Sequence, residues 1–269
     1  MFKSIKPPQH LKNYIDCFWL GDDSDLGEDQ PSHHSIASSK MEMLFFCRGI
    51  YSDTDDYGNS RPLHKAGLYG HTTHYRQYFG SALRTTIFGI KFFPLAAVSL
   101  FHLPASELTN IRVNITDILK TDDQEFIDEI LEAPSFEEKV SLAIHFFTPR
   151  CKPLDIKYRS VLSVIHEMQQ PGSPSIPQLV AGSCLSARQF ERHFKTLTGF
   201  SARTYLKLIR FEKMIRSGFS SSGHDDRRYI NMATELGYFD QAHFNRHFKE
   251  FTGINPGAYY SRLHLSAGH

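Results

Sequence analysis

The chain has 269 residues, of which 41% are apolar and 13% aromatic, and its formal net charge at pH 7 is +1. This composition excludes wholesale disorder, and the length suggests two domains. No apolar run reaches about 18 residues and no signal-peptide stretch is seen, so we expect a cytoplasmic protein without a membrane span. The four cysteines form no CxxC pair, which is typical of inert thiols in a reducing compartment.

The two halves of the chain differ in charge. Residues 153–269 carry 15 Lys and Arg against 9 Asp and Glu, a net of +6, whereas residues 1–152 carry 15 against 20, a net of −5. A basic half joined to an acidic half fits a nucleic-acid module attached to another domain. Pro149 and Pro153 oppose a continuous helix. We therefore predict a domain at 1–148, a linker at 149–153 and a second domain at 154–269.

The first half has mixed helix and strand signals and predicts an α+β domain, β-rich with helices. Leu11, Tyr14 or Ile15, and Phe18 recur at helical spacing. Aromatic and β-branched residues predict strands at 41–47 and 85–93, and the polar stretch 51–61 predicts a turn between strands. Amphipathic patterns predict helices at 122–131 and 135–147, the second starting with a capping-box pair, Ser135 and Glu138.

Histidines in the first half raise the question of a metal site. They are His33, His34, His64, His71 and His74. The HxxH spacing of the last two is weak outside a known context, so we expect solvated loop histidines and no metal or other cofactor. The chain also has no GxSxG, no Walker loop and no GxGxxG. We therefore predict that the protein is not an enzyme.

The second half predicts an all-α domain of about seven helices. Its expected helices are 154–170, 175–183, 186–198, 202–217, 228–236, 240–252 and a short one after Pro256. Ser186 and Asp240 are typical N-caps, and Gly199 and Gly253 follow the last residues of their helices.

An internal repeat lies within these helices. Residues 190–199 (FERHFKTLTG) align with residues 244–253 (FNRHFKEFTG) at an offset of 54, and 7 of the 10 positions are identical. In each copy a short helix, a turn of about three residues and a capped helix follow one another. Three apolar residues at i, i+4 and i+7 of the capped helix form one buried stripe. This is the pattern of a helix-turn-helix unit, present twice.

The opposite face of each capped helix carries side chains suited to DNA. The two faces consist of Ala187, Arg188, Glu191, Arg192 and Lys195, and of Gln241, Ala242, Asn245, Arg246 and Lys249. Arg, Gln and Asn bond guanine or adenine edges bidentately, and lysines one turn further along suit phosphates. Helix 202–217 is about 24 Å long and, with its flanking turns, could hold two recognition helices about 34 Å apart, one turn of DNA.

Residues 176–260 resemble the AraC/XylS-type DNA-binding domain. The resemblance rests on INMATELGYFDQAHF at 230–244, RHFK at 246–249 and TGINP at 252–256. The first unit departs at Gly182-Ser183-Cys184, where the family has larger apolar residues and a turn glycine. The resemblance implies base contacts from Arg188, Glu191, Arg192, Gln241, Ala242, Asn245 and Arg246. Lys195, His193, Lys249 and His247 are the expected phosphate contacts; for Glu191, rejection of a phosphate is an equal alternative.

The first half is similar to an uncharacterised domain that often precedes AraC-type modules. The similarity rests on YIDCFW at 14–19, MLFF at 43–46, FGIKF at 88–92 and LTN at 108–110. In the wider family this position usually holds a β-rich sensing or dimerisation domain.

Together these features predict a sequence-specific transcription regulator with two recognition helices in successive major grooves, controlled through its N-terminal domain. Expected partners are double-stranded DNA, RNA polymerase if the protein is an activator, a small-molecule effector at the N-terminal domain and a second copy in a homodimer. One alternative is an enzyme or small-molecule-binding protein with an appended DNA-binding module. Another is a protein-interaction module, whose binding should depend less steeply on salt.

Overall fold

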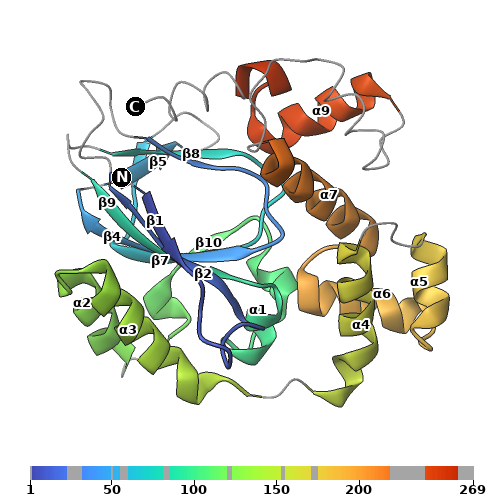
Figure 1. Cartoon of the computed structure of the whole chain (residues 1–269), viewed down its shortest axis with the longest axis horizontal. Helices are drawn as coiled ribbons and strands as arrows, with labels where there is room; N and C mark the ends of the chain where they lie inside the picture. The colour runs from blue at the N-terminus through green and yellow to red at the C-terminus, as the bar shows by residue number, and fades with distance from the viewer. Residues whose placement is uncertain are drawn as a thin grey trace.

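The computed structural model describes residues 2–22, 32–49, 51–54, 60–80, 85–119, 123–152, 155–170, 175–218 and 240–259. A β-rich N-terminal region lies beside a helical C-terminal region (Figure 1). The predicted fold class, an α+β region followed by an all-α region, is confirmed. Within the described stretches, no helix combines the length and apolar character needed to cross a membrane.

Two antiparallel sheets form the N-terminal region. The larger sheet has the order β1-β2-β9-β4-β7-β10 and the smaller one β3-β8-β5-β6. The strands of the larger sheet are β1 (Phe2–Ile5), β2 (Ile15–Asp22), β9 (Thr86–Phe92), β4 (Met41–Arg48), β7 (Ala66–Tyr69) and β10 (Arg112–Asn114). Those of the smaller sheet are β3 (Ser32–Ser35), β8 (Arg76–Gly80), β5 (Tyr51–Thr54) and β6 (Ser60–Pro62).

Alternating residues of the central strand β4 face two different clusters of apolar side chains. Met43 and Phe45 face a core that is closed by helices α2 (Gln124–Glu132) and α3 (Phe136–Phe147). There the Phe45 ring meets the Phe126 ring edge-on, with centroids 5.8 Å apart. Phe46, on the other face, packs against Tyr51 of β5 at 4.6 Å, which joins the two sheets. Each buried ring of this kind stabilises the fold by about 1.5–3 kcal/mol.

Short helical segments complete the N-terminal region. They are α1 (Leu95–Ser99), η1 (Ala105–Leu108), η2 (Ile115–Asp117) and η4 (Thr148–Arg150). The predicted helices 122–131 and 135–147 correspond to α2 and α3, and the Ser135 hydroxyl accepts a hydrogen bond from the Glu138 amide at 3.2 Å. The predicted strands 41–47 and 85–93 correspond to β4 and β9.

Two sequence predictions in this region were wrong. The helical spacing of Leu11, Ile15 and Phe18 does not mark a helix, because Leu11 lies in a turn and β2 starts at Ile15. The β-branched and aromatic side chains of this stretch favour a pleated strand over a helix. The stretch 51–61 also contains more than a turn, since β5 pairs there with β6; its residues 55–59 lie outside the described residues.

Helices make up the C-terminal region. They are η5 (Ile156–Tyr158), α4 (Arg159–Gln169), α5 (Ile176–Gly182), α6 (Ala187–Thr198), α7 (Ala202–Gly218) and α9 (Gln241–Thr252), followed by a helical turn at 256–259. The predicted helix 228–236 lies outside the described residues. Ala37, Leu95 and Val98 of the N-terminal region pack into the apolar core of these helices. The N-terminal region therefore has its own core and also contributes a few side chains to the core of the C-terminal helices.

Candidate nucleic-acid interface

The sequence repeat is also a repeat in side-chain packing. Phe190, Phe194 and Leu197 of α6 are buried, as are Phe244, Phe248 and Phe251 of α9. The Phe194 ring meets Tyr205 edge-on at 5.5 Å and 78°, and the Phe248 ring meets Tyr259 at 5.4 Å and 79°. Tyr205 and Tyr259 are again 54 residues apart. The two helices are therefore held by the same aromatic contact.

The two recognition helices also begin and end in equivalent ways. Ser186 caps α6 by accepting from the Gln189 amide at 3.3 Å, and Asp240 caps α9 by accepting from the His243 amide at 2.7 Å. Gly199 and Gly253 end the helices at φ +79° and +78°, a left-handed conformation that favours glycine. The predicted caps and terminators are confirmed.

Most of the predicted DNA-contacting side chains lie exposed on one face of α6 or α9. On α6 these are Arg188, Glu191, Arg192 and Lys195. On α9 they are Gln241, Ala242, Arg246 and Lys249, and Asn245 is half-buried on the same helix. Their guanidinium, amide and ammonium groups can approach a base edge or a phosphate without rearrangement of the core.

The two histidines predicted to touch phosphates are placed differently. The half-buried His193 ring packs edge-on against Tyr158 at 5.4 Å. His247 is only 6% exposed, with the His243 ring at 4.3 Å and Lys207 Nζ 3.5 Å from its Nε2. Burial, aided by the charge of Lys207, lowers the pKa of His247 to about 4. A buried neutral imidazole does not suit phosphate contact, so this prediction for His247 is corrected.

The turn of the first unit has no glycine, and Cys184 takes its place. Cys184 is exposed and adopts φ +57°. The Ser183 hydroxyl stabilises the turn, because it donates to the Val180 carbonyl at 2.6 Å and accepts from the Leu185 amide at 3.4 Å. The departure from the family pattern seen in the sequence is thus accommodated by side-chain hydrogen bonds.

The described part of the chain contains no cluster of potential metal ligands. Among those residues, no group of three or more His, Cys, Asp and Glu side chains could hold a metal ion. Of the expected solvated loop histidines, His64 and His74 are exposed, but His71 is fully buried, so the prediction for His71 was wrong. His33 and His34 lie in strand β3 and not in a loop, and their side chains are outside the described set.

The fold and a helix-turn-helix family match define the class of this protein, a DNA-binding transcription regulator. Residues 179–262 match the family described as a helix-turn-helix domain, and residues 3–114 match a domain of unknown function (DUF6597). The chain thus carries a helix-turn-helix domain behind an N-terminal region that matches a different family. Among curated proteins, no sequence matches this chain.

Solved structures with similarity to this chain have low sequence identity to it. A point variant of ToxT from Vibrio cholerae strain SCE256, solved in its apo form, is 12% identical, with 90% of this chain and 96% of that chain covered and a TM-score of 0.50. Wild-type ToxT from the same strain, bound to an unsaturated fatty acid, is 13% identical over 96% and 94%, with a TM-score of 0.48. The AraC-like transcriptional activator CuxR is 14% identical over 80% and 86%, with a TM-score of 0.28.

Proposed function

We propose that α6 and α9 read two successive major-groove segments on one face of a DNA duplex. The observation that supports this most directly is the duplicated recognition helix. Both copies bury the same aromatic contact and expose a polar face. Two units built alike within one chain can occupy grooves one helical turn apart, about 34 Å, without a second copy of the chain.

On α6, two arginines are the proposed base readers. Arg188 and Arg192 each donate two hydrogen bonds to a guanine edge, which an exposed guanidinium near a helix start can reach. Glu191 accepts a hydrogen bond from cytosine N4 or rejects a nearby phosphate. Lys195, one turn further along, contacts a phosphate, and His193 does so at the edge of this face.

On α9, amide side chains join one arginine. Gln241 and Asn245 bond adenine, Arg246 bonds guanine, and the methyl group of Ala242 contacts a thymine methyl group. Lys249 contacts a phosphate at the place that Lys195 has in the first unit. His247 takes no part, because it is buried.

We propose that the N-terminal domain controls DNA binding by the two recognition helices. It packs into the same apolar core as the recognition helices, so a change in its conformation reaches them directly. A small-molecule effector or a second copy of the chain is the proposed trigger, since either can shift a conformational equilibrium by binding one state more tightly.

Selection of bound duplexes from a random-sequence library, with the full chain at physiological salt, tests this function. The expected product is a motif of two half-sites about 10 base pairs apart. Affinity for that motif should fall steeply as salt rises, because bound phosphates release counterions. Retention of all sequences equally, with little salt dependence, would contradict DNA reading and favour a protein-binding module.

A further inference from the structure

One small structure of the N-terminal domain contacts both recognition units. It consists of residues 36–39 and 71–75, which we call the clasp. Ser38 and Thr72 pair through two backbone hydrogen bonds of 2.8 and 3.0 Å. Residues 36–39 lie just before β4 and residues 71–75 just after β7, and these two strands are antiparallel neighbours. The clasp therefore extends the β4–β7 pair of the larger sheet toward the helices.

The clasp meets the first unit where α6 ends. The buried His71 ring packs edge-on against Phe200 at 4.7 Å. Its Nε2 lies 2.8 Å from the Thr109 hydroxyl, which in turn donates to the Gly199 carbonyl at 3.1 Å. A Cβ atom added at Gly199 would lie 1.7 Å from His71 Nε2. The end of α6 thus packs against the clasp so closely that Gly199 has no room for a side chain.

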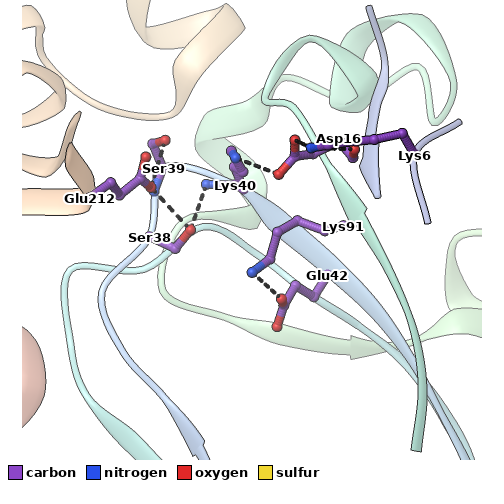
Figure 2. A network of polar contacts seen from close by, with 8 residues as sticks. All are labelled: Lys6, Asp16, Ser38, Ser39, Lys40, Glu42, Lys91 and Glu212. Atoms are coloured by element: carbon purple, nitrogen blue, oxygen red, sulfur yellow. Dashed lines mark hydrogen bonds and ion pairs between the residues drawn. The ribbon is translucent and has the colours of Figure 1, made fainter. Parts of the chain in front are cut away.

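The clasp also holds α7, the helix between the two units. The Glu212 carboxylate accepts hydrogen bonds from the Ser39 amide at 2.6 Å, the Ser39 hydroxyl at 2.9 Å and the Ser38 hydroxyl at 3.2 Å (Figure 2). The Ser38 hydroxyl accepts from the Lys40 amide at 3.1 Å, and Lys40 pairs with Asp16 of β2 at 2.5 Å. A continuous polar path therefore joins α7 to the larger sheet.

The second unit meets the same clasp at the end of α9. The Ala37 amide donates to the Phe251 carbonyl at 2.9 Å. A Cβ atom added at Gly253 would lie 2.8 Å from Cδ1 of Tyr75. Gly253 occupies the place in the second unit that Gly199 has in the first. Equivalent ends of both recognition helices therefore contact the same clasp.

We propose that the clasp sets the relative orientation of the two recognition helices and thereby fixes the half-site spacing that the protein accepts. It contacts the C-terminal ends of α6 and α9 and the middle of α7, while Arg192 and Arg246 on the reading faces stay exposed. It therefore positions the helices and does not cover them. Tandem modules gain affinity from each other only when their geometry matches both sites, so orientation determines spacing. This inference rests on the proposed function.

The test uses the full chain and duplexes in which the two selected half-sites are separated by varied numbers of base pairs. Glu212→Ala removes the acceptor of three clasp hydrogen bonds, and Tyr75→Ala loosens the clasp at the other unit. Glu137→Ala, the same change on the exposed face of α3, is the matched control. Circular dichroism melting confirms that each variant is folded before its binding is compared.

We expect the wild type and Glu137→Ala to prefer the best spacing over one a base pair longer by about tenfold or more. In Glu212→Ala and Tyr75→Ala this preference should fall to about threefold or less, with affinity for a single half-site unchanged within about twofold. An unchanged spacing preference in both folded variants would overturn the proposal. Tighter DNA binding by the variants at an unchanged spacing preference would also overturn it, because the clasp would then hinder DNA binding and not set the spacing. Absence of any selected half-site with the wild type would instead refute the proposed function itself.

Discussion

The two recognition units are alike inside and different outside. Their aromatic contacts agree within 0.1 Å and 1°, from 5.5 Å and 78° in the first unit to 5.4 Å and 79° in the second. On the reading faces, Arg192 and Arg246 are equivalent, as are Lys195 and Lys249. The remaining equivalent pairs differ: Ala187 and Gln241, Arg188 and Ala242, Glu191 and Asn245. Folding constrains the interior, while the exposed faces have diverged, so we expect two unlike half-sites.

Deleting the central phenylalanine ring of each unit tests whether the two interiors are equivalent. Phe194→Ala and Phe248→Ala should each lower the free energy of unfolding by about 3–5 kcal/mol, because each leaves a cavity beneath the buried face of its helix. Denaturant unfolding of the full chain measures this cost. Ile156→Ala, at a side chain that is 71% exposed, should change stability by less than about 0.5 kcal/mol. A cost below about 1 kcal/mol at either phenylalanine would show that the units are not equivalent.

The shared arginine of the reading faces gives a second comparison. Arg192→Ala and Arg246→Ala should each weaken binding to the selected duplex by about 1–3 kcal/mol and relax the preference at one base position. Competition binding with single-base variants of each half-site measures both effects. Lys3→Ala removes the same charge on the exposed strand β1 and serves as the control. Equal loss on all sequences would assign the arginines to phosphates.

The contact between the first unit and the clasp should depend on pH through the buried His71 ring. Burial lowers the pKa of His71 from its ordinary 6.5 to about 4, so the unfolded chain takes up the proton first. The stability that depends on neutral His71 is complete above pH 6.5 and is lost as the pH falls toward 4. At pH 5 the loss should be about 2 kcal/mol.

His71→Gln, which keeps a polar group near Thr109, isolates this effect. Unfolding of the wild type and the variant is compared at pH 7 and pH 5. The wild type should lose about 2 kcal/mol more than the variant between the two conditions. An equal loss in both proteins would mean that His71 does not titrate in this window.

The smallest expected loss of stability comes from removing the N-caps of α6 and α9. Ser186→Ala and Asp240→Ala should each cost about 1 kcal/mol, because an amide of the first turn loses its acceptor. Thermal unfolding measures the cost. Asp240→Asn and Ser186→Thr keep an acceptor oxygen and should cost much less. A full loss in these conservative variants would point to strain from the new side chain and not to the cap.

The features that sequence predicted well are local. Helix periodicity, the caps Ser186 and Asp240 and the glycines after α6 and α9 act within a few residues, so a single chain displays them. The burial of His247 was not predicted, although its position three residues after Phe244 and four before Phe251 places it on the apolar side of α9 and could have indicated it. The start of β2 was misread because Leu11 and Ile15 are both buried at a spacing that a turn followed by a strand can also produce.

The features that sequence missed depend on contacts between distant residues. Glu212 and Ser39 are 173 positions apart, and nothing in either neighbourhood marks them as partners. Thr109 and Gly199 are 90 positions apart, and Gly199 is explained equally well as a helix terminator. The predicted base contacts stay predictions, because only binding measurements with DNA can test them.

The exposed turn residue Cys184 also gives the protein a natural labelling site. Burial raises the pKa of the Cys17, Cys47 and Cys151 thiols, which leaves less of the reactive thiolate at neutral pH, and all three are partly covered. A maleimide dye should therefore alkylate Cys184 first, without any engineered substitution. Because Cys184 lies in the turn just before α6, the fluorophore would sit beside the first recognition helix and could report the approach of DNA to that unit.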